Sequence, residues 1–379
     1  MIRYDSKSAS APSAGAPSFL ESKNRRQKAR SAGMHPDYWY PAEKSERLKR
    51  GKALGIKFWG RSIAIFRDHN GQVHAVEDRC AHRQVKLSLG QVKGCNLVCM
   101  YHGWEFDAQG KLVNIPHELF NKPFPQIRIG SFPVQERYGL IWIFPGNPEL
   151  KDVHRLPDIP ELEGADQWGL VSIDFKWRGH HSMVLDNVSD FTHAYLHRRF
   201  KPFSDAKLTK LESIGDRVYL SYDTKVGRGR IAQYFVNRRE VDTDRMDLCY
   251  EYPYQWSNID NKIKHHCFVL PMDEKFTHAF FLFYFKKLVV PGINVTIPHG
   301  VLNRVLAIAN KLHITPLIKE DGVAVAAEQE GYDEHYDAPL AELSPAVAQF
   351  QQLTIRKWEE YLATRPADKP APLSQLRVQ

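Results

Sequence analysis

The sequence predicts an α+β protein in which a small all-β domain precedes a larger domain with a mostly antiparallel sheet and several helices. Two observations support this class. The first part of the chain has short apolar runs separated by turn residues, which are typical of β-hairpins. The second part has longer apolar runs and ends in segments with helical periodicity. With 379 residues, the chain is long enough for two domains that each have their own core.

The elements follow this order along the chain. The first domain is expected over residues 35–155, with an apolar run at 63–66, the hairpin signal Asn70-Gly71 and a buried strand at 139–144. The second domain is expected over residues 156–379. Its predicted strands cover 171–177, 218–222, 230–236, 266–270 and 277–285, and its predicted helices cover 185–199, 301–312, 323–332 and 347–362.

Residues 1–34 are expected to form a disordered basic tail. This segment is rich in Ser, Ala and Pro and has a basic cluster at 23–28. It lacks the apolar core of a secretory signal, so a cytoplasmic protein is expected. A transit-like peptide or a tether to an anionic surface is the alternative interpretation.

Composition and charge limit the classes of partner. Hydrophobic residues make up 43% and charged residues 25% of the chain, as in ordinary globular proteins. No apolar run approaches the roughly 18 residues of a transmembrane helix, so no transmembrane segment is expected. The net charge of +8 would suit nucleic acid, but no nucleic-acid motif accompanies it, and no such partner is expected. The charge could instead attract an acidic protein.

Two short segments each offer one thiolate and one imidazole. They are Cys80-x-His82 and Cys99-x-x-His102. Two Cys on one iron and two His on the other describe a Rieske-type [2Fe–2S] cluster. A structural zinc site is the competing interpretation, but zinc fingers usually pair Cys with Cys and His with His. The chain has five cysteines, and Cys95 fits neither segment, so we interpret it as a buried or free thiol.

Residues 79–106 resemble the Rieske domain of ring-hydroxylating and related oxygenases. The resemblance rests on Cys80-Ala81-His82-Arg83 and on Cys99-Met100-Tyr101-His102-Gly103-Trp104. Val85 stands where the Rieske proteins of cytochrome complexes have an additional cysteine. Rieske ferredoxins are similar here but end soon afterwards. The resemblance implies an N-terminal Rieske domain and a C-terminal catalytic domain of the helix-grip type.

A second constellation lies in the predicted helix 185–199. On one helix, Asp190, His193 and His197 would fall within an arc of about 60°. By itself, such a His pair is more often a polar surface or a satisfied interior pair. Rieske oxygenases, however, have an Asn/Asp-x-x-Asp-x-x-His-x(3 or 4)-His segment here. Together with Asn187, these residues match its shorter form, to which carbazole-type terminal oxygenases are similar.

The third ligand of a mononuclear Fe(II) would be anionic. The family supplies it downstream, at or near the start of a helix. We predict Asp321, with Glu320 and Glu328 as alternatives, because it precedes the expected helix 323–332. Asp321 could equally be only the N-cap of that helix. Asp333 and Asp337 lie past it.

The resemblance implies an oxygenase component, a mono- or dioxygenase that uses O2 and electrons from an NAD(P)H-driven reductase or a ferredoxin. It would hydroxylate or demethylate a small organic molecule. The aromatic run 280–285 suggests an apolar or aromatic substrate, although such runs are more often plain core. The resemblance also implies a homotrimer in which Asp190 bridges His193 and His102 of the neighbouring subunit. The alternatives are an electron carrier without a catalytic iron and a zinc module.

Overall fold

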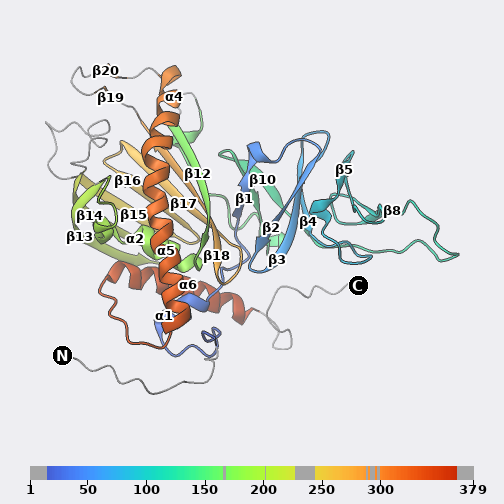
Figure 1. The fold of residues 1–379 in the computed structure, drawn as a ribbon, viewed down its shortest axis with the longest axis horizontal. Coiled ribbons are helices and arrows are strands. Elements are labelled where there is room, and N and C mark those ends of the chain that lie inside the picture. Colours follow the sequence, from blue (N-terminus) through green and yellow to red (C-terminus); the bar gives the residue numbers. More distant parts are fainter. Residues whose placement is uncertain are drawn as a thin grey trace.

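The computed structural model describes residues 15–164, 168–200, 202–226, 244–286, 289–290, 295–296 and 299–364. The strand predicted at 230–236 lies outside these ranges. Figure 1 shows an all-β part beside a larger part in which helices pack on a broad sheet. The predicted α+β class is therefore confirmed.

The all-β part contains three small antiparallel sheets. The first joins β1 (Tyr40–Lys44), β11 (Leu140–Ile143) and β10 (Val134–Arg137). The second joins β2 (Lys52–Phe58), β3 (Arg61–Arg67), β4 (Val73–Glu77) and β9 (Ser131–Phe132). The third joins β5 (Gln91–Lys93), β6 (Asn96–Val98), β7 (Glu105–Phe106) and β8 (Leu112–Asn114). Short 3₁₀ turns cover Ser45–Arg47, Leu87–Leu89, Pro148–Leu150 and Pro160–Leu162.

The larger part is built on a seven-stranded antiparallel sheet in the order β12-β18-β17-β16-β15-β14-β13. Its strands are β12 (Gly169–Arg178), β13 (Phe203–Ile214), β14 (Arg217–Val226), β15 (Asp244–Glu251), β16 (Tyr254–Ile259), β17 (Ile263–Pro271) and β18 (Phe276–Phe285). A separate pair joins β19 (Val289–Val290) and β20 (Val295–Thr296). The predictions matched β12, β14, β17 and β18. They missed β13, β15 and β16. In β13, an edge strand, Lys207, Lys210 and Glu212 obscure the apolar period.

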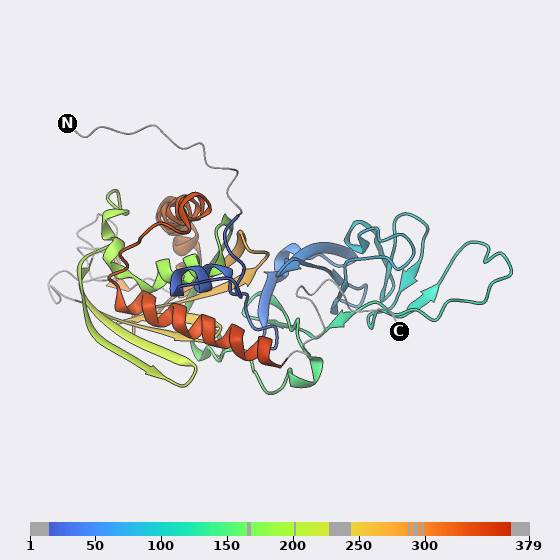
Figure 2. The ribbon, with the colours of Figure 1, turned by 90° about the horizontal axis from the view of Figure 1, so that it is seen from below.

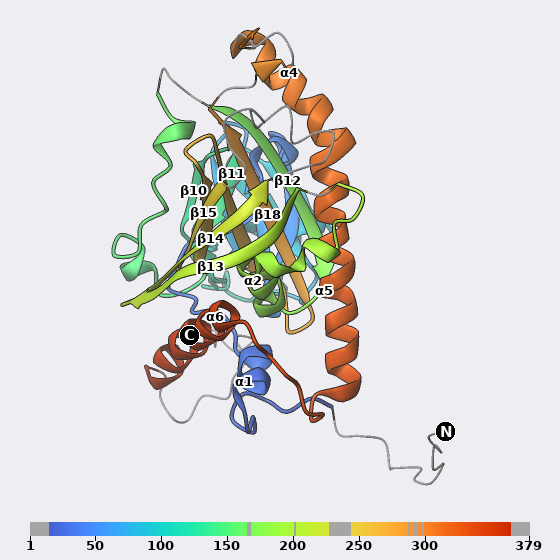
Figure 3. The ribbon, with the colours of Figure 1, turned by 90° about the vertical axis from the view of Figure 1, so that its left-hand side faces the viewer.

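Helices cover one face and one end of this sheet. They are α1 (Arg25–Ser31), α2 (His181–Ser189), α4 (His299–Ala309), α5 (Thr315–His335) and α6 (Pro345–Ala363). Figure 3 shows α5 running the length of the sheet, and Figures 2 and 3 show α1 beside α6 at its end. No helix in the described ranges is long and apolar enough to span a membrane.

The helices predicted at 301–312 and 323–332 are parts of one continuous helical segment. A π-helical turn, Asn310–Ile314, joins α4 to α5. Asp321 therefore lies inside α5, and the N-cap interpretation is wrong. Gly322 lies inside α5 and is required by packing, because a Cβ there would lie 2.4 Å from Nε1 of Trp177.

The expectation of a disordered tail is wrong for the residues that form α1. This helix is held by Arg30, whose side chain is only 5% exposed and lies 2.7 Å from Asp186 of α2. The same guanidinium lies 2.6 Å from Glu328 of α5. Composition could not reveal these partners, because both lie more than a hundred residues away in sequence.

One hydrophobic core spans both parts, and a second, smaller core lies within the all-β part. The ring of Trp142 on β11 packs edge-on against Phe268 on β17, with centroids 4.9 Å apart. Charged groups border this contact: Asp174 on β12 lies 3.1 Å from Lys44 and 2.6 Å from Arg47. Because both cations come from the all-β part, they fix its orientation on the sheet.

We expect Arg30→Met to lower the free energy of unfolding by about 3 kcal/mol, because it leaves the buried Asp186 carboxylate without its cation. Urea denaturation followed by circular dichroism would measure this. Lys28→Met on the same helix is the control, since the Lys28–Glu359 pair is 38% and 49% exposed and should contribute less than about 1 kcal/mol. Equal losses in both variants would contradict the role of Arg30.

Candidate metal centres and substrate pocket

The four predicted cluster ligands come together at the third small sheet. Cys80 and Cys99 are buried, and the rings of His82 and His102 lie 4.5 Å apart. Burial raises the pKa of the Cys80 thiol to about 11, and the neighbouring Cys99 adds to this effect. Two adjacent buried thiols of this kind are stable as thiolates only beside a strong positive charge such as iron.

The two ligand loops repeat one backbone pattern. The N–H of Cys80 donates to the carbonyl of Val85, as the N–H of Cys99 does to that of Trp104, both at 2.8 Å. Four residues after each cysteine the backbone is left-handed, at Gln84 (φ 59°) and at Gly103 (φ 70°). Glycine is required only at the second position, where a Cβ would lie 2.7 Å from Pro116.

The environment of His82 fits an iron ligand. Its Nδ1 is buried and has no hydrogen-bond partner among the residues that the structure describes. The ring is held by stacking on Trp104, with centroids 4.7 Å apart and an interplanar angle of 4°. Trp104 is itself fixed by donating from Nε1 to Nε2 of His117 at 3.1 Å. A buried nitrogen without a partner is costly, and a bond to iron would satisfy it.

The second constellation does not lie on one helix, as predicted. α2 ends at Ser189, and Asp190 is extended (φ −105°, ψ 97°) before a 3₁₀ turn at Phe191–Tyr195. The Asp190 carboxylate causes this break by accepting from the N–H of Thr192 at 2.9 Å and from its hydroxyl at 2.7 Å. His193 and His197 still converge, with ring centroids 5.2 Å apart.

Asp321 completes this group. Its Oδ1 lies 3.5 Å from Nε2 of His193 and 3.3 Å from Nε2 of His197. All three ligand atoms lie within 4.8 Å of one another. Asn187, predicted as part of the motif, donates from Nδ2 to the same Oδ1 at 3.3 Å. Two imidazoles and one carboxylate on one side are the donor set of a non-heme iron(II) site.

Nδ1 of each imidazole, the nitrogen that faces away from Asp321, already has a polar partner. Nδ1 of His193 contacts the backbone carbonyl of Asp190, and Nδ1 of His197 lies 2.9 Å from Glu320. With its proton on Nδ1, each ring presents an Nε2 lone pair toward Asp321. Burial lowers the pKa of His193. Burial also lowers the pKa of His197, but the carboxylates of Asp321 and Glu320 outweigh it, so that this pKa is raised overall.

The other acidic candidates lie elsewhere. Glu320 contacts Nδ1 of His197, whereas Asp321 lies on the Nε2 side of the ring. Glu328 pairs with Arg30, and Asp333 pairs with Lys275 at 3.0 Å. Among the described residues, the Asp190 carboxylate accepts hydrogen bonds from Thr192, whereas the Asp190 backbone carbonyl contacts His193.

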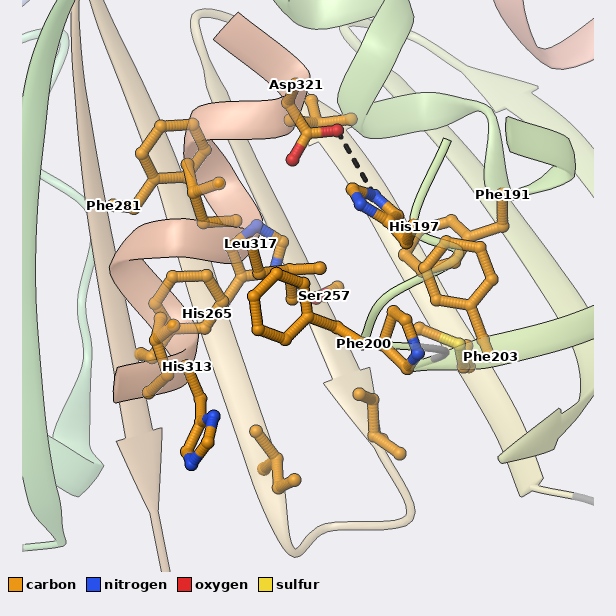
Figure 4. Close-up of a pocket in the computed structure, with 18 of the residues that line it drawn as sticks. Phe191, His197, Phe200, Phe203, Ser257, His265, Phe281, His313, Leu317 and Asp321 are labelled. Carbon is orange, nitrogen blue, oxygen red and sulfur yellow. Dashed lines mark hydrogen bonds and ion pairs between the residues drawn. The ribbon is translucent and has the colours of Figure 1, made fainter. Parts of the chain in front are cut away.

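A cavity of roughly 270 Å³ opens beside the three ligands. Figure 4 shows His197 and Asp321 at one end of it, His313 at the other, and aromatic side chains between them. Its lining residues are mostly apolar: Val188, Phe191, Phe200, Pro202, Phe203, Met246, Ile259, Ile263, Phe281, Phe283, Phe285, Ile314, Leu317 and Ile318. Away from the ligands and Asn187, the polar lining residues are Ser257, His265 and His313, and the described lining contains no Lys or Arg.

Sequence reasoning missed Ser257, His265 and His313. The alternation of residues 263, 265 and 267 on β17 is the signal that could have placed His265 on the cavity face. His313 lies in the π-helical turn, which periodicity does not predict.

We expect Glu320→Ala to weaken iron(II) binding at the mononuclear site about 10- to 100-fold, because His197 loses the acceptor that orients it. The measurement is iron(II) titration of protein depleted at that site, with the cluster followed by EPR. Glu330→Ala, exposed on the same helix, is the matched control. His193→Ala should lose this iron and keep the two irons of the cluster. Unchanged affinity in Glu320→Ala would contradict the role of Glu320.

Comparison with known proteins agrees with both centres. Residues 38–125 match the model of the Rieske [2Fe-2S] domain, and residues 177–365 match that of the vanillate O-demethylase oxygenase C-terminal domain. The first match contains all four cluster residues. The second contains His193, His197 and Asp321.

The relatives are oxygenases. The chain is 44% identical over 351 residues to a 4beta-methylsterol monooxygenase of Methylococcus capsulatus, an alignment that covers 92% of this chain and 95% of that protein. It is 38% identical over 163 residues to a vanillate O-demethylase oxygenase subunit of a Pseudomonas species, covering 42% of this chain and 44% of that one. A crystal structure of dicamba monooxygenase with 3,6 dichlorosalicylic acid has a TM-score of 0.72 and 26% identity, covering 88% of this chain and all of that one. The chain thus belongs to the Rieske-type non-heme iron oxygenases, as an oxygenase component that carries a [2Fe–2S] cluster and a mononuclear iron.

Proposed function

We propose that this chain hydroxylates or oxidatively demethylates a neutral, largely apolar ring compound of the methylsterol class. The observation that carries the proposal is the lining of the cavity, which is apolar and has no Lys or Arg among its described residues. The relative that aligns over 92% of the chain is named for a methylsterol substrate, which has this character.

The lining argues against a carboxylate substrate. Vanillate and dicamba, for which two relatives are named, carry a carboxylate. An ionised carboxylate in an apolar site needs a cation or several donors. The imidazole of His265 does not supply the charge, because burial lowers its pKa to about 4. Burial and, to a smaller extent, Arg199, which does not line the cavity, lower the pKa of His313.

We assign the cluster to Cys80, His82, Cys99 and His102, and the iron to His193, His197 and Asp321. When bound, the cluster supplies single electrons and the iron activates O2. The protein itself orients the ligands, as the Asp190 carbonyl and Glu320 do for the imidazoles, and it surrounds the reacting carbon with aromatic rings that exclude water.

The electron donor is a reductase or ferredoxin, as in other oxygenase components of this family. We propose an acidic ferredoxin-like donor, because the chain has a net charge of +8. Free cysteines, including the exposed Cys95, suit a reducing compartment, so the cytoplasm is the proposed location.

We further propose a head-to-tail homotrimer. Within one chain, the small sheet that carries the cluster loops lies at the far end of the molecule from α2 (Figure 1). Electrons would instead pass from His102 to His193 of a neighbouring subunit through Asp190. The exposed side chains of Tyr101 and Tyr195, 55% and 75% exposed, lie beside these residues and provide surface for such a contact.

The substrate class is tested by supplying NADH, a reductase and 18O2 to the purified protein. We expect 18O incorporation into a 4β-methylsterol, with vanillate and dicamba oxidised at least about tenfold more slowly, since each would bring an unpaired carboxylate into the cavity. Mass spectrometry of the products measures both. Faster turnover of either acid would refute the proposed substrate class.

The trimer and the bridge are tested by Asp190→Asn, which keeps an oxygen to accept from Thr192 but removes the charge. Light scattering should give three times the chain mass for both proteins. We expect turnover in the variant to fall about 10- to 100-fold with iron content unchanged. A monomer, or a variant with full turnover, would contradict this arrangement.

A further inference from the structure

A polar pair lies within the apolar cavity. The Ser257 hydroxyl on β16 hydrogen-bonds to Nδ1 of His265 on β17, directly opposite in the strand register. Figure 4 shows both residues between the ligand end of the cavity and His313. On the same strands and face, their neighbours are the apolar Ile259 and Ile263 on one side and the buried Gln255 and Cys267 on the other.

We propose that Ser257 and His265 bind one hydroxyl oxygen of an otherwise apolar substrate and so determine which carbon lies next to the iron. This inference rests on the proposed function and names the group by which the substrate is held. The two residues are specificity-determining positions and take no part in the chemistry.

The His265 imidazole is fixed by its neighbours, and its Nε2 is available for a hydrogen bond to a ligand. Its ring stacks on Phe283 of β18, with centroids 5.1 Å apart and an interplanar angle of 14°. Ser257 occupies Nδ1, and Nε2 has no hydrogen-bond partner among the described residues. Because burial lowers the pKa of His265 to about 4, the ring is neutral near pH 7.

A neutral imidazole suits a hydroxyl in either tautomer. If the serine hydroxyl donates to Nδ1, Nε2 carries the proton and donates to the substrate oxygen. If Nδ1 donates to the serine, Nε2 accepts from the substrate hydroxyl. A carboxylate would be matched by a single donor only, which leaves most of its charge without partners.

The register places this pair close to the reacting position. Ser257 and His265 line the same cavity as His193, His197 and Asp321. Cys267 lies two residues beyond His265 on the same face of β17, and burial, with a smaller contribution from Asp321, raises the pKa of its thiol. Two residues along a strand span about 7 Å. The substrate hydroxyl is therefore expected on the reacting ring or on the ring next to it, with the rest of the molecule toward Ile259 and Ile263.

The test compares the binding of two probes to wild type and to variants. It uses the oxidised holoenzyme, which does not turn over without an electron donor. The probes are 4β-methylcholestan-3β-ol and the same compound without its 3-hydroxyl group, titrated calorimetrically. We expect wild type to bind the hydroxylated probe about tenfold more tightly. In His265→Phe, which preserves the stack on Phe283, the two probes should bind equally.

Control variants separate a hydroxyl site from a merely structural pair. Ile259→Val, in the same cavity, should weaken the binding of both probes alike. The ratio of their two dissociation constants should therefore stay unchanged. Ser257→Ala should reduce the preference for the hydroxylated probe, whereas Ser257→Thr, which keeps the hydroxyl, should have the wild-type preference. A ratio that stays at its wild-type value in His265→Phe would overturn the inference and leave the proposed function standing. Failure of wild type to bind either probe would overturn the substrate class, and this inference with it.

Discussion

The buried carboxylate of Asp321 is the constraint on which the catalytic part depends. Such a group is stable inside a protein only when donors or a cation surround it. Here Asn187, His193 and His197 converge on it, so α5 must pass close to the end of α2. The absence of a side chain at Gly322 permits this approach by letting Trp177 pack against the helix.

The break after α2 gives the imidazoles their orientation. A regular helix through Asp190 would have made its carbonyl an ordinary helical acceptor and unavailable to His193. The short 3₁₀ turn turns the carbonyl toward Nδ1 instead, while the carboxylate is used to cap the turn. Asp190 therefore both ends the helix and orients the ring of His193. Glu320 on α5 orients the ring of His197 in the same way.

The cavity shows how a shared catalytic centre can serve a particular substrate. The ligand end is polar and crowded, whereas the sheet presents aromatic and branched side chains interrupted by one hydrogen-bonded pair. Apart from Asp321 at the ligand end, the described lining has no Asp, Glu, Lys or Arg, so selection among substrates rests on shape and on neutral hydrogen bonds. The core shared with the all-β part holds the sheet at a constant angle to the cluster, which a closed ring of subunits would require.

The sequence by itself predicted the α+β class, and residue chemistry at short spacing indicated the pairs Cys80/His82, Cys99/His102 and His193/His197. Asp321 was predicted among several acidic residues through the family resemblance. Tertiary structure alone decided the rest. Arg30 orders α1 through partners distant in sequence, so composition wrongly indicated disorder there. Asp321 was interpreted as a possible helix cap because the helix was expected to begin at residue 323, whereas α5 begins at Thr315. Ser257 and His265 became a pair only through the register of the β16–β17 hairpin. The turn at Asp260 and Asn261 sets this register, and the sequence-based predictions did not include the hairpin.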